Sequence, residues 1–469
     1  MRINRRAFLA ASAAAATLPS RLRAQAGPVF RPEDFGAKGD GATNDGRAFA
    51  ALSSEVNRRG GGTIVLRQGR TYIVGAQHRG GDYGWTPAPV LELKQLSRPL
   101  SILGNGAKLR CAPGLRYGAF DPDTGASVHS PTPSRQLAEV ATPYRAMIFI
   151  TGCRAPIEVS DVELDGNVER LRIGGQFGDS GWQIPATGLI LEENTGPETV
   201  ANVLSHHHAQ DGAMIIGAAA RTGRGRVSRL ICRTNGRQGL SMVAGRSYDF
   251  ADCEFSHTGR SVIRSAPGAG VDIEAERRPI RDLNFTRCKF VDNAGCGLVA
   301  DSGDSAGAHF VDCLFVGTTT WSAWPNKPRF SFRGCTFVGA VVHPFPNLDP
   351  ALATHFVGCR FTDDPKLAPG GKVYVGNGPI ANMAISDNIL FDGCSFTLVG
   401  KGTLPWSWRA IYRDCKMVQR SPAKGMPKGR YLGRSTISGN VDLYGTMAEG
   451  ELFINGKHVP HGSQGGPPW

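Results

Sequence analysis

Short strands with one apolar and one polar face recur along the second half of the chain. Seven times between residues 253 and 417, a cysteine is followed two positions later by phenylalanine or methionine, usually across a polar residue. Because successive side chains of a strand point to opposite faces, the cysteine and the larger residue share a buried face. The repeats begin at Cys253, Cys288, Cys313, Cys335, Cys359, Cys394 and Cys415. One strand every ~20–35 residues predicts a solenoid, and this spacing fits the coils of a parallel β-helix.

A second series of strands, each led by glycine, lies mainly upstream of the cysteine repeats. These segments begin at Gly188, Gly212, Gly239, Gly270 and Gly297. The second and fourth residues of the segments are mostly apolar, which predicts that the third and fifth residues point outward. If the coils wind in register, the outward residues form one ridge. The polar members of that ridge are Glu192, Ser241, Asp272, Glu274 and Asp301.

The stretch from Asp34 to Phe49 begins Asp-Phe-Gly-Ala-Lys-Gly-Asp-Gly. It resembles the N-terminal phrase of the pectate-lyase-like superfamily of right-handed parallel β-helix proteins. Asp45 is placed to cap a following helix. Phe49, Leu52 and Val56 would lie on one face of that helix and could cover the open end of the coil stack.

The resemblance implies an all-β fold: a single-stranded right-handed parallel β-helix (solenoid) with an N-terminal capping helix. We expect the β-helix to occupy residues 27–420, and residues 421–469 to form a C-terminal cap and a disordered tail. Within the β-helix, residues 116–144 are rich in Pro, Ser, Thr and Gly, which predicts a long loop.

Residues 1–26 read as an export signal. Arg5 and Arg6 stand before a mild Ala- and Leu-rich run that ends in Ala24-Gln25-Ala26, and the arrangement resembles a twin-arginine signal peptide. The protein is therefore expected in the periplasm or outside the cell, exported in the folded state. The apolar run is too short to predict a membrane span. The 11 cysteines are an odd number, and their regular column favours buried thiols over disulfides.

Asp272, Glu274 and Asp301 are the strongest candidates for chemistry. Asp272 and Glu274 stand two apart on one strand, and Asp301 would follow one coil later. Carboxylates that are this close repel one another, so they need a cation, a shared proton or arginine partners. Each of these is also a catalytic device: a metal site, a raised-pKa acid beside an ionised base, or an ion-pair network. The alternative is that Arg237, Arg264, Arg277 or Arg278 merely neutralises the acids.

Further candidates flank this ridge and could contact a substrate. Asp211 and Gln238 each precede a ridge glycine, and His208 lies just before Asp211. On one strand His206 and His208 would share a face and His207 would point away, so a three-histidine metal site is not expected. Glu192 on the ridge, and the aromatic rings of Trp182, Trp321 and Trp324, could also contact sugars. Each Trp could equally cover the core.

The resemblance implies a carbohydrate-active protein. The characteristic catalytic motifs of pectate lyases and of polygalacturonases cannot be matched to this sequence residue by residue. The first hypothesis is a polysaccharide lyase that cleaves an acidic polymer by β-elimination. Asp272, Glu274 and Asp301 would then hold calcium, and Arg264 or Arg237 would remove the proton. The alternatives are a glycoside hydrolase that uses the clustered carboxylates, or a non-catalytic glycan-binding or envelope structural β-helix. The net charge of +13 suits a polyanion. Nucleic acid is disfavoured, because the basic residues are scattered.

Overall fold

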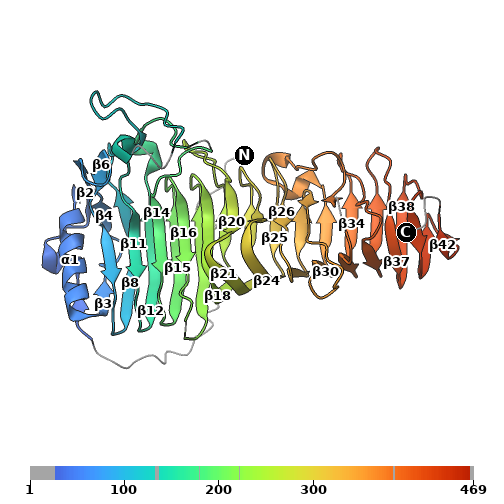
Figure 1. Cartoon of the computed structure of the whole chain (residues 1–469), viewed down its shortest axis with the longest axis horizontal. Helices are drawn as coiled ribbons and strands as arrows, with labels where there is room; N and C mark the ends of the chain where they lie inside the picture. Colours follow the sequence, from blue (N-terminus) through green and yellow to red (C-terminus); the bar gives the residue numbers. More distant parts are fainter. Residues whose placement is uncertain (1–26, 133–136, 179, 221, 384–385, 465–469) are drawn as a thin grey trace.

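A computed structural model describes residues 27–464 apart from 133–136, 179, 221 and 384–385, so the predicted export signal lies outside the described residues. The chain winds into an elongated right-handed parallel β-helix with helix α1 (Gly46–Arg59) at its N-terminal end (Figure 1). Each coil contributes strands to up to three faces, which we call faces 1, 2 and 3. The predicted fold class is confirmed.

Face 1 contains the glycine-led strands. Its members are β7 (Leu91–Lys94), β11 (Ala146–Thr151), β14 (Thr187–Glu192), β16 (Asp211–Ile216), the start of β18 (Gln238–Ala251), β20 (Ala269–Ile273), β23 (Leu298–Ala300), β26 (Ala323–Pro325), β29 (Val341–Val342) and β32 (Ala381–Asn382). All pair in parallel, each with the strand of the next coil.

Faces 2 and 3 are joined by a sharp bend within or between strands. Face 2 contains β1 (Val29–Phe30), β3 (Gly62–Val65), the first parts of β8 (Leu100–Cys111), β12 (Ile157–Asp165), β15 (Glu198–His206) and β17 (Gly225–Arg233), the ends of β18 and β21 (Ala275–Thr286), and β24 (Gly303–Val311), β27 (Ser331–Arg333), β30 (His355–Val357), β33 (Leu390–Asp392), β35 (Ile411–Arg413), β37 (Gly429–Leu432) and β39 (Thr446–Ala448). Face 3 contains β2 (Asp40–Asn44), β4 (Thr71–Val74), the ends of β8, β12, β15 and β17, then β19 (Glu254–Ser256), β22 (Lys289–Val291), β25 (Leu314–Val316), β28 (Thr336–Val338), β31 (Arg360–Thr362), β34 (Ser395–Leu398), β36 (Lys416–Gln419), β38 (Arg434–Gly439) and β40 (Glu451–Ile454).

The bend explains why the cysteine repeat has its particular spacing. The residue before each repeat cysteine has a positive φ, for example 57° at Asp252 and 53° at Asp312. The left-handed residue interrupts the strict alternation of inward and outward side chains. As a result, two side chains point inward: the aromatic residue three positions before the cysteine, and the Phe or Met two positions after it. Face 2 therefore carries its own aromatic column, which we did not predict. Its members are Phe250, Phe285, Phe310, Phe332, Phe356, Phe391, Tyr412 and Tyr431.

Aromatic rings of neighbouring coils are stacked along both columns. On face 3 the centroids of Phe290 and Phe315 are 4.4 Å apart, and on face 2 those of Phe310 and Phe332 are 4.8 Å apart. A fully buried Phe contributes roughly 2–3 kcal/mol by leaving water, and ring pairing adds about 0.5–1.5 kcal/mol. The cysteines fill the bend as free thiols, as predicted. Cys313 Sγ lies 3.4 Å from the carbonyl oxygens of both Phe285 and Val311.

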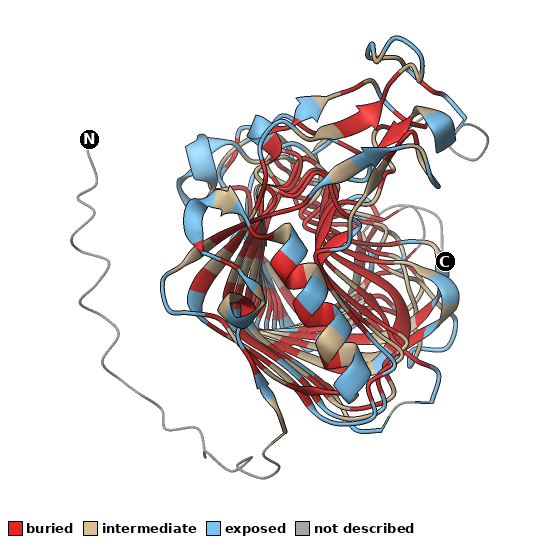
Figure 2. Cartoon of the chain, turned by 90° about the vertical axis from the view of Figure 1, so that its left-hand side faces the viewer, coloured by how far each residue is buried: buried red, intermediate tan, exposed pale blue. Residues whose placement is uncertain are grey.

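Helix α1 lies across the open N-terminal end of the coils (Figure 2). Phe49, Leu52 and Val56 are completely buried on its inner side, as predicted. Asp45 does occupy the N-cap position, but its side chain does not cap the helix. Its carboxylate instead accepts hydrogen bonds from the backbone N–H groups of Lys38 and Gly39, and so it holds the preceding loop.

Two segments differ from the sequence prediction. Part of the expected loop 116–144 joins a small second sheet made of β5 (Gln77–Arg79), β6 (Trp85–Pro87), β9 (Arg116–Ala119), β10 (Val140–Ala141) and β13 (Arg172–Ile173). Trp85 is buried there between the guanidinium groups of Arg79 and Arg116. The prediction failed because these strands are short and pair with partners far along the chain.

The C-terminal region continues the winding beyond residue 420. Strands β37 to β40 pair in parallel with the preceding coils, and β41 (Lys457–Val459) and β42 (Gly462–Ser463) close the stack with antiparallel pairs. Of the expected disordered tail, Gly462–Ser463 form β42 and residues 465–469 lie outside the described residues. The 3-10 helices are η1 (Pro32–Phe35), η2 (Leu137–Glu139), η3 (Val168–Arg170), η4 (Pro365–Leu367) and η5 (Pro369–Gly371).

Candidate functional site

The predicted ridge exists on the outer side of face 1. Ser241 of β18 is in register with Asp272 of β20, which is in turn in register with Val299 of β23. In the next position, Glu192 is paired with Ile216, where a register shift pairs Ile216 with Ala244, and Glu274 follows directly after β20. Up to that shift the glycine-led segments wind in register, and acids that are far apart in the sequence lie along one side of the molecule.

Asp272 carries the most unusual carboxyl group of this surface. The residue is only 5% exposed, and the side-chain amide of Gln238 donates a hydrogen bond of 2.5 Å to its Oδ2. Burial, and then the negative charge of Glu274, raises the pKa of Asp272 to about 8, although Arg237 opposes the shift. Near neutral pH this carboxyl group is therefore protonated and can donate a proton.

Asp211 and Arg237 form a buried ion pair beside Asp272. The guanidinium of Arg237 donates to both oxygens of Asp211, at 2.9 and 2.6 Å. Burial disfavours the charge on Arg237, but the Asp211 carboxylate outweighs this effect and raises the pKa of Arg237. Ser241 also donates to Asp211, at 2.9 Å. This pair positions its neighbours, and its arginine is a poor candidate for a base because losing its proton would leave a buried carboxylate unpaired.

Glu274 and Asp301 lie at the more accessible end of the cluster. Glu274 is half-buried and accepts a hydrogen bond of 2.7 Å from the hydroxyl of Ser302, whereas Asp301 is exposed. Both negative charges act on Asp272 and raise its pKa. Ligand atoms of Asp272, Glu274 and Asp301 do not all lie within 4.8 Å of one another, so the three carboxylates do not converge on one point. Calcium binding by these residues stays a prediction.

The arginines considered as neutralising partners pair with other acids. Arg277 lies 3.1 Å from Glu192, which also has Arg145 at 3.4 Å, and Arg278 pairs with Glu193. Glu192 is only 8% exposed. Its two arginines can interact with a ligand only in competition with this carboxylate. Arg264 is exposed on the loop between β19 and β20.

His208 is a core residue and not a contact for substrate. Its side chain is completely buried, with Nδ1 2.9 Å from the hydroxyl of Tyr144 and Nε2 3.1 Å from the carbonyl oxygen of Leu164. Burial lowers the pKa of His208 to about 3. The alternation assumed for the three histidines fails, because β15 ends at His206 and His207 has a φ of 53°.

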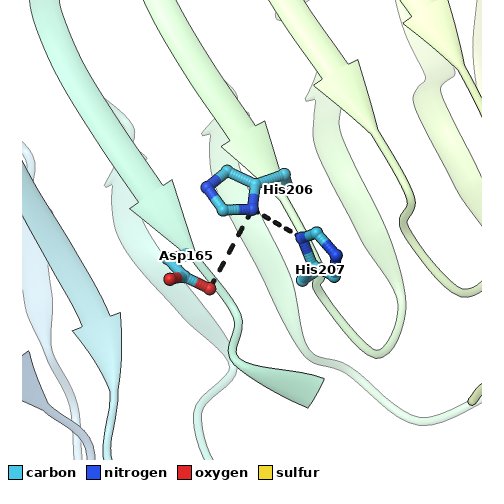
Figure 3. Close-up of side chains that lie close together, drawn as sticks. All are labelled: Asp165, His206 and His207. Atoms are coloured by element: carbon cyan, nitrogen blue, oxygen red, sulfur yellow. Dashed lines mark hydrogen bonds and ion pairs between the residues drawn. The ribbon is translucent and has the colours of Figure 1, made fainter. Parts of the chain in front are cut away.

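That turn brings His206 and His207 together, near Asp165 at the end of β12 (Figure 3). These three residues lie on the outer side of face 3, away from the face 1 ridge. Among the described residues, they are the group of three His, Cys, Asp or Glu side chains whose ligand atoms approach within 4.8 Å.

Aromatic side chains lie at the ends of the ridge. Trp182 is half-buried against the core, and its indole N–H donates to the carbonyl oxygen of Gly174 at 3.3 Å. Trp321 and Trp324 cover Cys296 and Val299, with their ring centroids 5.5 Å apart. Trp324, which was also predicted as a ring that could contact sugars, is in register with Val299 on the outer side of face 1.

A cavity of about 440 Å³ opens at the N-terminal end of the same surface. Its lining includes Tyr83, Arg145, Phe149 and Pro185. Phe149 stands in the column of Ile190, Met214, Ser241 and Asp272. From Phe149 to Trp324 the column crosses seven strands, which is roughly 29 Å at ~4.8 Å per strand. Sequence reasoning missed this cavity because one of its walls comes from the separate segment around Tyr83.

The comparisons with known proteins agree on the fold. No protein-family model matches the chain, and no curated protein matches it. Among solved structures, the A-module of the mannuronan C-5 epimerase from Azotobacter vinelandii matches 90% of this chain and 100% of its own, with a TM-score of 0.50 and 14% identity. An N-terminal fragment of gene product 12 of bacteriophage phi29 matches 92% of this chain and 73% of its own, with a TM-score of 0.52 and 14% identity.

Fold and site together define a right-handed parallel β-helix protein with a polar cluster on the outer side of face 1. At such low identities the likeness establishes the shared fold alone. No helix in the described part of the chain has the length and apolar character of a membrane span.

Proposed function

We propose that the protein binds a polysaccharide along the outer side of face 1 and cleaves it by hydrolysis. The observation that carries this proposal is the buried carboxyl group of Asp272, hydrogen-bonded by Gln238 and near Glu274, whose charge contributes to its raised pKa. Asp272 lies on β20, and Glu274 follows directly after this strand. Inverting glycosidases use such a pair, one protonated carboxylic acid and one carboxylate. Asp272 would protonate the leaving oxygen, and Glu274 would activate water.

The surroundings of the pair support a long and acidic ligand. Tyr83 lies at one end of this surface and Trp324 at the other, and such rings can stack on sugars. Arg145 and Arg264 are cationic groups close to this surface or on a neighbouring loop. One structural neighbour is itself a mannuronan C-5 epimerase. We therefore propose an acidic polysaccharide as the substrate.

Cleavage by β-elimination is the second candidate, and the exposed side chain of Arg264 favours it. Arg264 precedes Ser265, whose hydroxyl accepts hydrogen bonds from the backbone N–H of Trp182 and from the side-chain amide of Gln183. The side-chain oxygen of Gln183 in turn accepts a hydrogen bond from Arg237. Arg264 has no carboxylate partner within the described part of the chain, so it is better placed to act as a base than Arg237. In this version Asp272, Glu274 and Asp301, whose ligand atoms do not converge on one point, would have to move together to hold a calcium ion that neutralises a uronate. We further propose that the reaction takes place after export, in the periplasm or outside the cell.

One assay separates the candidates. The purified protein is incubated with uronate-containing and neutral polysaccharides, and both new reducing ends and absorbance near 235 nm are followed. Hydrolysis gives reducing ends alone, and elimination also gives the absorbance, which a chelator abolishes if calcium is required. Asp272→Asn should lower the rate by roughly 10²–10⁴-fold. Asp252→Asn, at an exposed bend away from face 1, is the control.

Binding without cleavage would leave a glycan-binding protein. If no polymer of the panel is cleaved but one is retained, and Asp272→Asn retains it equally well, the enzymatic proposal is wrong. The non-catalytic alternative then accounts for the ridge, with Asp272 as a buried neutral acid.

A further inference from the structure

Two histidines and an aspartate lie together on the outer side of face 3, at the ends of the adjacent strands β12 and β15. Nδ1 of His206 lies 2.6 Å from Nδ1 of His207 and 4.0 Å from Oδ1 of Asp165 (Figure 3). We propose that Asp165, His206 and His207 form a binding site for a divalent transition-metal ion of the Zn²⁺ class. This site is independent of the polysaccharide surface on face 1.

A carboxylate outside the cluster orients the His206 ring. Oε1 of Glu163 lies 3.0 Å from Nε2 of His206. Because a carboxylate only accepts hydrogen bonds, this contact places the proton on Nε2 and leaves a lone pair on Nδ1, which faces His207 and Asp165. A carboxylate that fixes the far nitrogen of a ligating histidine is a regular feature of metal sites. Lys108 in turn holds Glu163, at 2.7 Å.

The aspartate is also held with one oxygen directed at the histidines. Arg110 donates to Oδ2 of Asp165 at 2.7 Å, and the backbone N–H of Asn167 donates to Oδ1 at 2.9 Å. Oδ1 keeps a further lone pair. Asp165 is 6% exposed and His206 is 9% exposed, so both side chains are largely held in place before an ion binds.

The distances suit a small ion after a modest rotation of the rings. Ligands of a tetrahedral zinc ion lie about 2.0–2.2 Å from the metal, which places them about 3.4 Å from one another. The observed distances of 2.6 and 4.0 Å lie on either side of that value. Two nitrogen ligands and one oxygen favour Zn²⁺, Co²⁺, Ni²⁺ or Cu²⁺ over Ca²⁺ and Mg²⁺.

The site is open on one side, as a three-ligand centre requires. A cavity of about 250 Å³ adjoins the cluster, so water or an anionic ligand could occupy a fourth position. The other residues that line it are Lys108, Arg110, Asn167, Val168 and Glu169. The bound ion would also link the coil of Asp165 to the coil of the histidines, which predicts a gain in thermal stability on binding.

His257 provides a matched control for His207. It occupies the equivalent turn after β19, with a φ of 56° against 53° for His207, but no second histidine lies beside it in sequence. Asn tolerates this left-handed conformation. His207→Asn and His257→Asn therefore place the same residue in the same kind of turn, and only the first removes a proposed ligand.

Zn²⁺ binding to the full chain, expressed without a histidine tag, tests the proposal. Titration calorimetry should give one site per chain, Zn²⁺ should raise the Tm, and Co²⁺ should give visible absorption bands of a nitrogen-ligated ion. His207→Asn should weaken Zn²⁺ binding at least 100-fold, and Asp165→Asn should do the same. His257→Asn should bind as tightly as the unsubstituted protein, and Ca²⁺ should not compete.

Two results would overturn the site: no Zn²⁺ binding by the unsubstituted protein, or equal affinity in His207→Asn and His257→Asn. If Asp165→Asn fails to fold because Arg110 loses its partner, the variant His207→Asn, at a half-buried turn position, still decides the question, with circular dichroism confirming its fold.

Discussion

Arg237 reaches from the start of β18 to the preceding coil and donates two hydrogen bonds to the carboxylate of Asp211. Neither oxygen of Asp211 is exposed to water, since the side chain is 0% exposed, and 15% of the Arg237 side chain remains exposed. The pair therefore joins two coils below the polar cluster of face 1. It also places a fixed positive charge next to Asp272, which limits the rise in the pKa of that carboxyl group.

Substituting Arg237 alone should lower the free energy of unfolding far more than substituting Arg237 and Asp211 together. Arg237→Gln leaves the Asp211 carboxylate buried without a counter-ion, which costs about 3–5 kcal/mol. The double variant Arg237→Gln/Asp211→Asn should recover a large part of this loss, because no buried charge remains. Urea unfolding of the two single variants and the double variant measures the coupling. Additive effects would show that Asp211 and Arg237 do not depend on each other.

Asp272 should make the stability of the protein fall as the pH rises. Its pKa of about 8 in the folded state is above the ordinary value of 3.8, so between these values the folded chain holds a proton that the unfolded chain has lost. Stability from this group is complete below about pH 4, declines up to about pH 8 and is then constant. Asp272→Asn removes this pH dependence. The Tm of the variant relative to that of the unsubstituted protein should therefore increase from pH 4 to pH 8.

Leu348→Ala is the control for that measurement, because it changes no titratable group at an 82% exposed position, and its difference in Tm from the unsubstituted protein should not depend on pH. A difference in Tm between the unsubstituted protein and Asp272→Asn that stays the same from pH 4 to pH 8 would mean that the carboxyl group of Asp272 ionises normally.

The repeats predicted the winding of the chain well, because glycine-led strands and Cys-x-Phe strands each obey the simple alternation of side chains. The ridge of Ser241, Asp272 and Glu274 follows from that alternation and from equal register between coils. The failures occur at turns. A left-handed residue such as His207 or Asp252 changes the direction of the next side chain, and spacing alone does not reveal its φ. For this reason His208 was assigned to the surface, and the aromatic column that contains Phe310 was missed.

The cysteine thiols should be unreactive in the folded protein. All eleven are buried, and burial raises the pKa of Cys153 to about 11 and that of Cys415 to about 12. The reactive thiolate is therefore scarce at these two positions at pH 8, and burial denies a reagent access to all eleven sulfur atoms. A chromogenic thiol reagent should label none of them in native buffer and eleven per chain in denaturant. Rapid labelling of any thiol in native buffer would contradict the buried column.

The aromatic columns should be the main source of stability in the second half of the β-helix. Phe332 is stacked between Phe310 at 4.8 Å and Phe356 at 5.0 Å, and it contacts Phe337 of face 3 edge-on at 5.4 Å. Phe332→Ala would remove contacts with two coils and both columns at once. A cavity of this kind costs about 3–5 kcal/mol. Leu348→Ala, at an 82% exposed position, should change stability by no more than about 0.5 kcal/mol.

In a solenoid each coil contacts only its neighbours, so the damage should also be local. Hydrogen exchange should accelerate most at the backbone N–H groups of β24, β27 and β30, which contain Phe310, Phe332 and Phe356. Strands near α1 should keep their protection unless the whole chain unfolds as one unit. Equal acceleration along the entire chain would therefore show that the coils unfold together, and that the columns transmit the loss from one end of the β-helix to the other.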